Sequence, residues 1–337
     1  MEQRKLGLAG PAVSAIGLGC MGMSDFYGPA DRGESMATIH AALDAGITLL
    51  DTGDFYGMGH NEMLIGQALA GRNREKALVS VKFGALRDPA QGWQGYDARP
   101  AAVKNFLAYT LKRLGVDYID IYRPARLDWR VPIEDTVGAI ADMVKAGYVR
   151  HIGLSEVGAE TIRRAHAVHP ISDLQIEYSL ISRGIEAEIL PACRALGIGV
   201  TAYGVLSRGL ISGHWSKERG GEKGFRGISP RFQAGNLDAN LALLQPLRAI
   251  AGQIGATPAQ TAIAWVAAQG ADIVPLVGAR RRAQLQESLG ALKVRLAAGH
   301  LTALAQAFAP GVAAGGRYPD WELAHMDSEK GAGPSGG

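Results

Sequence analysis

Cysteine is nearly absent from this chain of 337 residues, which contains only Cys20 and Cys193 and no CxxC pair. Two thiols this far apart argue against a disulfide framework and against a thiolate zinc site, and they predict a reducing, cytoplasmic location. The sequence also has no cluster of histidines, cysteines and acids with metal-ligand spacing, so no metal site is predicted.

Long hydrophobic runs and excess charge are missing as well. No apolar run approaches the roughly 20 residues of a membrane span, and the polar residues 1–5 do not form an apolar signal segment. The formal net charge is only +3, which gives no reason to expect nucleic acid or an anionic membrane as a partner.

Apolar residues, by contrast, make up 47% of the chain and are enough for a large core. Eight short apolar segments alternate with segments of helical periodicity, and they lack polar alternation, as strands buried on both faces of a parallel sheet do. Eight such units in about 250 residues, plus insertions, predict an α/β fold of the (β/α)8 TIM-barrel type. The predicted strands cover residues 13–20, 47–50, 77–82, 118–122, 149–154, 174–178, 199–203 and 273–277.

The predicted helices have recognisable boundaries, such as Pro132 at one start and Gly115 after one end. They cover residues 34–45, 61–69, 101–114, 132–145, 159–168, 186–196, 240–254, 258–268, 280–292 and 300–308. Long loops are expected at 87–99 and 207–239. We predict a single barrel domain over residues 1–325 with an N-terminal hairpin and extra helices, and a disordered tail from 326 to 337.

A doubly wound open sheet is the alternative fold, and it usually carries a GxGxxG pattern after its first strand. Gly17, Gly19 and Gly22 match that spacing. The next predicted helix begins well downstream, after residues 26–29, which argues against a Rossmann unit.

Three titratable side chains stand at the ends of two successive predicted strands. Asp51 follows the strand 47–50 directly, Tyr56 comes five residues later, and Lys82 ends the next strand. In a barrel these strand ends carry the chemistry. A tyrosine ordinarily ionises near pH ~10, and a neighbouring ammonium lowers that value. The three residues therefore predict one tuned acid, able to protonate a developing alkoxide.

Polar residues at other strand ends suggest a ligand that carries an amide and an anion. An amide would be held by Ser155 and Gln175, and an aromatic ring would stack on Tyr203. Three consecutive arginines at 280–282 crowd the start of the last barrel helix, where the helix dipole disfavours cations. With Gly278 allowing close approach, either a bound phosphate or a solvated basic turn explains them.

The stretch Asp51-Thr52-Gly53-Asp54-Phe55-Tyr56-Gly57 resembles the DTAxxYG motif of the aldo-keto reductases. Residues 132–136, 153–156 and 175–179 resemble the bacterial and plant branch of that family, and the likeness runs from residue 17 to about 319. The resemblance implies an NADP(H)-dependent oxidoreductase that interconverts small aldehydes or ketones and alcohols. It also implies Tyr56 as the general acid or base, with Lys82 and Asp51 tuning it.

The resemblance further implies where the cofactor lies: the carboxamide at Ser155 and Gln175, the ring on Tyr203, and the 2′-phosphate near Arg280. The implied cofactor contacts are Gly19, Met21, Ser155, Gln175, Tyr203, Leu206, Arg208, Gly278, Arg280, Gln284, Glu287 and Ser288. The expected substrate pocket contains Trp93, Arg123, Ala125, Arg126 and Trp129.

The chain departs from the family pattern where the catalytic histidine is expected. That position aligns with Ala125, which has no hydrogen-bond donor in its side chain. Loss of one such donor costs on the order of 3 kcal/mol of transition-state stabilisation. The candidate replacements are Arg123, Arg126 and a water molecule.

Other departures leave further alternatives open. Gln284 stands where the pattern has an arginine and Ser288 where it has an asparagine, so NAD(H) remains an alternative to NADP(H). Because Ala125 replaces the histidine, a catalytically weakened, cofactor-binding sensor or partner protein is one alternative function. A reductase specialised for an unusual acceptor, using Arg123 or Arg126, is the other.

Overall fold

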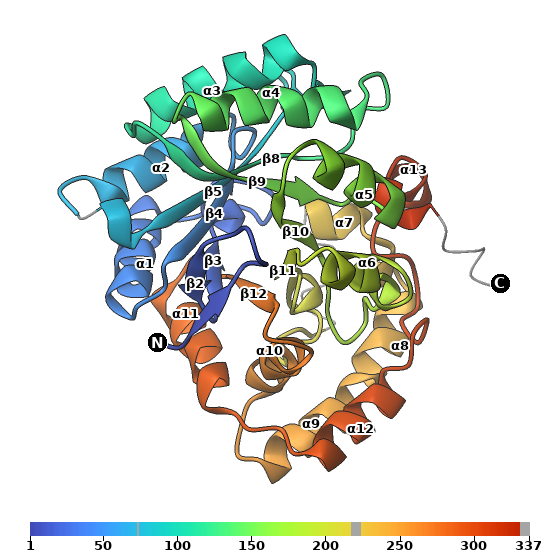
Figure 1. Cartoon of the computed structure of the whole chain (residues 1–337). Coiled ribbons are helices and arrows are strands. Elements are labelled where there is room, and N and C mark those ends of the chain that lie inside the picture. The colour runs from blue at the N-terminus through green and yellow to red at the C-terminus, as the bar shows by residue number, and fades with distance from the viewer. Residues whose placement is uncertain (73, 217–223, 331–337) are drawn as a thin grey trace.

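The computed structural model describes residues 1–72, 74–216 and 224–330. Eight parallel strands form a closed barrel in the order β10-β11-β12-β3-β4-β5-β8-β9, which confirms the predicted (β/α)8 fold. Figure 1 shows these strands at the centre with helices around them. The barrel strands are β3 (Gly17–Gly19), β4 (Leu49–Gly53), β5 (Leu78–Phe83), β8 (Ile119–Pro124), β9 (Val149–Ser155), β10 (Ile171–Glu177), β11 (Gly199–Tyr203) and β12 (Ile273–Gly278).

Helices follow the strands and cover the outside of the barrel. They are α1 (Arg32–Asp44), α2 (His60–Leu69), α3 (Pro100–Leu114), α4 (Ile133–Lys145), α5 (Ala159–Val168), α6 (Ile189–Ala195), α10 (Pro258–Ala268) and α11 (Arg282–Gly290). The additional helices are α7 (Phe225–Ile228), α8 (Asn236–Ala242), α9 (Leu244–Gln253), α12 (Ala298–Ala307) and α13 (Asp320–Leu323). Local sequence explains their ends: α10 starts with a Thr257–Gln260 capping box, and α3 stops at Gly115 with φ 64°.

The N-terminal hairpin pairs β1 (Gln3–Lys5) with β2 (Ala12–Ser14) and lies outside the barrel. Leu6 and Val13 pack against Leu49 and Val274, so the hairpin closes the barrel where its strands start. The predicted continuous strand 13–20 was therefore wrong. The chain bends between β2 and β3, where the Ser14 hydroxyl donates to the Ile16 carbonyl at 2.7 Å.

Two other segments differ from their predictions. The expected loop 87–99 contains a hairpin of β6 (Ala85–Arg87) and β7 (Trp93–Tyr96). The expected helix 240–254 is divided into α8 and α9. Pro246 lies in the first turn of α9 and cannot donate a backbone hydrogen bond to the preceding helix, so the division falls just before it.

The predicted disordered tail was wrong for residues 326–330. Asp327 is buried, and its carboxylate accepts a hydrogen bond from the Gly158 amide at the start of α5. Glu329 pairs with Arg317. Residues 331–337, to which the same prediction applied, lie outside the described residues.

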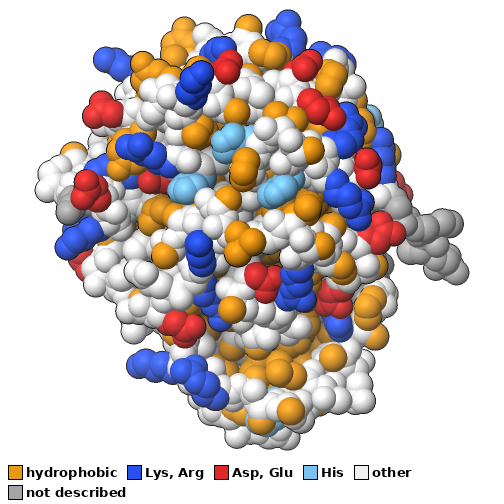
Figure 2. Space-filling view, in the orientation of Figure 1, with side chains coloured by type: hydrophobic (Ala, Val, Ile, Leu, Met, Phe, Trp, Pro, Cys, Tyr) orange, Lys and Arg blue, Asp and Glu red, His pale blue; other side chains and the backbone are white. Residues whose placement is uncertain are grey.

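The surface shows no large region of one charge on the face seen in Figure 1. Figure 2 shows acidic and basic side chains interspersed over that face. Among the described residues, none of the helices has the length and apolar content that a membrane crossing requires.

Candidate active site

Asp51 and Lys82 meet inside the end of the barrel because β4 and β5 are neighbouring strands. The Lys82 ammonium donates to Asp51 Oδ1, and both residues are only 4% exposed. The Ser80 hydroxyl donates to Asp51 Oδ2 at 3.0 Å. The pair is thus buried and held by a third residue, which favours one geometry over many.

Tyr56 lies beside this pair. The Lys82 ammonium is 5.2 Å from the centre of the Tyr56 ring, and Tyr56 is 6% exposed. The chain leaves Tyr56 through a tight turn in which Gly57, Met58 and Gly59 all have positive φ. The structure therefore brings together the three residues that the sequence singled out.

The protonation of Tyr56 differs from the prediction. Burial raises the pKa of Tyr56 well above its ordinary value, and the charge of Asp51 acts in the same direction. Burial also lowers the pKa of Lys82. Burial and the Asp51 charge therefore outweigh the cations nearby, and the pKa of Tyr56 lies above its ordinary value, where the sequence predicted a lowered one. The phenol is protonated, which is the form that a proton donor requires.

Gln175 and Ser155 lie next to each other on β10 and β9. The Gln175 amide is already engaged: it donates to Asp51 at 2.7 Å and accepts from Lys82 at 2.8 Å. The buried Ser155 hydroxyl has no hydrogen-bond partner among the described residues. An orphaned hydroxyl here fits the carboxamide of a nicotinamide, which would supply the missing bond.

Tyr203, at the end of β11, is bonded to residues that the sequence analysis did not assign to the site. Its hydroxyl donates to Glu156 at 2.7 Å and lies 2.9 Å from the Tyr318 hydroxyl. Arg317 forms an ion pair with Glu156, which has φ 53° directly after β9. Glu156 follows a strand as Asp51 does and was open to the same inference. No local pattern marks Arg317 or Tyr318.

We predict that Glu156 contributes to acid stability. Burial alone would raise its pKa, but Arg317 and Arg126 lower the pKa of Glu156 to about 2. A lowered carboxyl pKa adds stability above the ordinary value of 4.5, which is lost as the pH falls toward 2. The contribution is about 3 kcal/mol at neutral pH.

Urea unfolding at several pH values checks this prediction. Glu156→Gln should flatten the loss of stability between pH 4.5 and 2. The matched control Glu134→Gln, in an exposed pair with Arg164, should keep the wild-type slope. An unchanged slope in Glu156→Gln would contradict the prediction.

The basic turn before α11 is partly occupied by the protein itself. Arg280 donates to the carbonyl of Tyr27 at 2.7 Å, and its own amide donates to Gln284. Arg282 pairs with Glu34, whose carboxylate also accepts from the Arg282 amide at 2.8 Å. The Arg281 side chain makes no hydrogen bond or ion pair with any described residue, so its guanidinium can bind an anion.

The other expected cofactor contacts lie on both sides of this turn. Gly19 pairs with Gly278 across β3 and β12, and an added Cβ at Gly278 would meet open space. The remaining positions are Met21 in the turn after β3, Leu206 and Arg208 after β11, Glu287 paired with His214, and the buried Ser288. Arg208 is in contact with Glu177 at 3.5 Å.

The two candidate tryptophans lie in different places. The Trp93 ring stacks on the Phe26 ring with 5.9 Å between centroids, and the Phe26 and Tyr56 centroids are 6.1 Å apart. Trp93 is therefore close to the candidate catalytic residues. Trp129 instead lies against Lys330 and donates to the His325 carbonyl.

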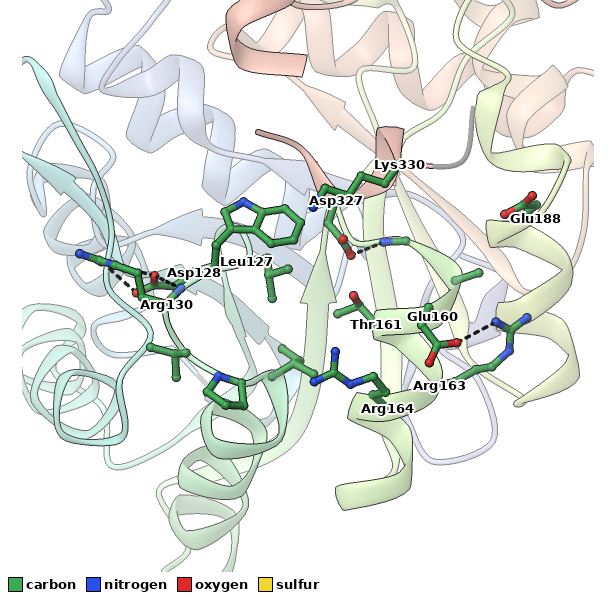
Figure 3. Close-up of a pocket in the computed structure, with 16 residues that line it drawn as sticks. Leu127, Asp128, Arg130, Glu160, Thr161, Arg163, Arg164, Glu188, Asp327 and Lys330 are labelled. Atoms are coloured by element: carbon green, nitrogen blue, oxygen red, sulfur yellow. Dashed lines mark hydrogen bonds and ion pairs between the residues drawn. The ribbon is translucent and has the colours of Figure 1, made fainter. Parts of the chain in front are cut away.

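Trp129 lines a separate cavity of about 630 Å³ beside the starts of α4 and α5. Figure 3 shows this cavity with Asp327 and Lys330 on one side and Arg163 and Arg164 on the other. The structure therefore does not support Trp129 as a residue of the expected substrate pocket.

The two candidate replacements for histidine also differ. Arg123 is fully buried and pairs with Asp173 at 2.9 Å inside the barrel, so it is not available to a substrate. Arg126 is partly exposed and donates to the carbonyl of Ala125 at 2.7 Å. The burial and the ion pair of Arg123 therefore argue against the expected contact with substrate, whereas the partly exposed Arg126 can still make one.

A sequence profile of the Aldo/keto reductase family matches residues 15–308. The chain belongs to this family. A protein named probable aldo-keto reductase 1 from Glycine max is 43% identical over 317 residues, which are 93% of this chain and 91% of that protein.

Two solved structures also resemble this aldo-keto reductase. One is the glycerol dehydrogenase AKR11B4 from Gluconobacter oxydans, with a TM-score of 0.84, 28% identity, and coverage of 91% of this chain and 95% of that one. The other is the thermostable aldo-keto reductase Tm1743 in complex with the inhibitor epalrestat, with a TM-score of 0.75, 27% identity, and coverage of 91% and 100%. Family membership implies a nicotinamide-dependent oxidoreductase that acts on small carbonyl compounds.

Proposed function

We propose that this aldo-keto reductase reduces aldehydes or ketones to alcohols, or catalyses the reverse reaction, with NADP(H) as cofactor and Tyr56 as general acid. The observation that best supports the proposal is the buried Lys82–Asp51 pair beside the Tyr56 ring. When bound, the dihydronicotinamide supplies a hydride for the carbonyl carbon. Tyr56 donates the proton to the carbonyl oxygen, and the nearby Lys82 stabilises the phenolate that remains.

Ser155 supports the placement of the cofactor. Its buried hydroxyl has no partner in the part of the chain that the structure describes, and Ser155 is paired with Gln175 across β9 and β10. In this proposal Ser155 binds the carboxamide of the cofactor. Gln175, which is hydrogen-bonded to both Asp51 and Lys82, lies next to Ser155 and places that pair beside the carboxamide. The nicotinamide ring is then oriented against Tyr203, at the end of the same barrel.

Steady-state oxidation of NADPH with a panel of aldehydes and ketones tests the function. We expect turnover on at least one class, lost when Tyr56 is replaced. No turnover on any carbonyl compound, with NADPH binding confirmed by calorimetry, would refute the proposal. It would favour the second candidate, a cofactor-binding sensor, for which the missing histidine at Ala125 is the specific support.

The preference for NADP(H) rests on the basic turn before α11. The Arg281 side chain has no partner among the described residues, and the positive end of the α11 dipole lies beside it. Glu34 places a carboxylate at the same helix start through its bond to the Arg282 amide. In this proposal the 2′-phosphate binds next to Arg281 and is repelled by Glu34.

We therefore predict that Glu34→Gln tightens NADPH binding about twofold to fivefold, because the amide keeps the hydrogen bond and removes the charge. NADH binding should change little. Fluorescence titration with both cofactors measures the effect, with Glu160→Gln in the exposed pair with Arg163 as the control. Equal changes for NADPH and NADH would contradict a 2′-phosphate at this turn.

A further inference from the structure

Arg126 stands at the end of β8 without an ion-pair partner among the described residues. Within the described part of the chain its side chain makes one hydrogen bond, to the carbonyl of its neighbour Ala125, and its buried Nε atom has no partner there. Neighbouring arginines are committed to carboxylates: Arg123 to Asp173, Arg208 to Glu177, and Arg317 to Glu156. Arg126 is thus the arginine of this group that has no ion pair with a described residue.

The position of Arg126 relates it to the reacting centre. The amide of the preceding Ala125 donates to the Phe83 carbonyl at 2.8 Å, one residue beyond Lys82 on β5. Burial raises the pKa of Tyr56, and the Arg126 charge is the cationic influence that opposes it. Alanine at 125 has only a methyl side chain and offers no donor, whereas the neighbouring Arg126 is a cation whose charge reaches Tyr56.

Apolar rings surround Tyr56 on another side. The centroid of the Phe55 ring lies 4.7 Å from that of Tyr56, and the centroid of the Phe26 ring lies 6.1 Å from it. Trp93 packs against both phenylalanines, at 5.8 and 5.9 Å. These three side chains, which we call the aromatic wall, favour an aryl or other bulky apolar group on the substrate.

We propose that Arg126 binds the carboxylate of a 2-oxo acid whose carbonyl oxygen meets Tyr56 and whose apolar group packs on the aromatic wall. This inference rests on the proposed function and names its substrate class. The carbonyl carbon gains the hydride from NAD(P)H, the C=O electron pair moves to oxygen, and that oxygen takes the Tyr56 proton. The products are NAD(P)⁺ and a 2-hydroxy acid, and a proton from water restores Tyr56.

The chemistry of guanidinium favours a carboxylate over a lone carbonyl oxygen. A guanidinium presents N–H groups in a planar fork that matches two coplanar oxygens. A neutral carbonyl would accept one bond and leave the rest of the fork without an acceptor at a site of low solvent access. Since the carbonyl oxygen must also reach Tyr56, the carboxylate has to be bonded to the carbonyl carbon or very near it.

Paired substrates test the charge preference. Phenylglyoxylate and its methyl ester carry the same ketone and ring, and the ester carbonyl is the more electrophilic. Wild-type enzyme should nevertheless show a kcat/KM for the acid about tenfold to a hundredfold higher than for the ester. A preference for the ester would overturn the proposal.

Two variants separate charge from geometry. Arg126→Met should remove the preference, chiefly through KM for the acid, and Arg126→Lys should retain a small part of it because the charge stays and the fork is lost. The control Arg163→Met changes an exposed arginine that lines the cavity near α5, and it should keep the wild-type preference. An unchanged preference in Arg126→Met would overturn the proposal.

Calorimetry with phenylglyoxylate, in the protein with and without NADP⁺, provides a readout without turnover. Binding that is lost in Arg126→Met and kept in Arg163→Met supports the carboxylate site. If no carbonyl compound is reduced at the same time, the proposed reductase function fails and the carboxylate site stands. Binding that is equal in wild type and Arg126→Met overturns the site, whatever the turnover measurements give.

Discussion

Tyr56→Phe is expected to lower kcat for carbonyl reduction by about 10²- to 10⁴-fold, because the variant keeps the ring and removes only the proton that the alkoxide must receive. The Tyr56 hydroxyl has no hydrogen bond to any described residue, so stability should change little. Cofactor binding should also persist, since the proposed carboxamide contacts lie at Ser155 and Gln175. Steady-state kinetics and cofactor titration on the purified variant measure the two properties separately.

Tyr122→Phe is the matched control. It removes a buried phenolic hydroxyl that donates to the Val103 carbonyl, away from the Lys82–Asp51 pair. This control should lose some stability and keep its kcat. Turnover by Tyr56→Phe within tenfold of wild type would rule out the phenol as the principal proton donor.

Arg123→Met is expected to destabilise the fold by about 3–5 kcal/mol, because it leaves Asp173 buried without its cationic partner. Both side chains are fully buried, and the Asp173 carboxylate also accepts a bond from Thr201. The barrel interior thus contains an ion pair that holds β8 against β10 across β9. Urea unfolding measures the loss.

The double variant Arg123→Met/Asp173→Leu should recover much of that stability, since it removes both charges together. The exposed pair Arg72–Asp44 supplies the control, and Arg72→Met should cost no more than ~1 kcal/mol. If Arg123→Met were as stable as wild type but inactive, Arg123 would have the substrate role that its burial argues against.

The grouping of Asp51, Tyr56 and Lys82 could be predicted from the sequence, because it depends on where the strands end. Asp51 and Lys82 come at the ends of apolar segments, and a closed parallel barrel brings such ends to one rim. The roles of the arginines were not accessible in this way. Arg123 and Arg126 are three residues apart, at and just after the end of β8. Only the position of Asp173 on β10 shows that Arg123 is held in an ion pair, whereas Arg126 has none among the described residues.

The two tryptophans illustrate the same limit. Both lie in loops that follow barrel strands, so the sequence predicted the same place in the substrate pocket for each. The β6–β7 hairpin carries Trp93 toward Tyr56, whereas the loop before α4 places Trp129 beside the C-terminal residues 325–330. Loop direction depends on contacts between segments far apart in the chain, which local periodicity does not encode.

By itself, the sequence determined the barrel and the set of Asp51, Tyr56 and Lys82, because alternating apolar segments and residues at strand ends are local properties. Only the tertiary structure decided that Arg317 and Tyr318 reach Glu156 and Tyr203, and that Arg126 forms no ion pair with a described residue. Those outcomes depend on which side chains meet after the C-terminal segment folds over the barrel. Such pairings follow from burial and charge in three dimensions, and short-range patterns do not contain them.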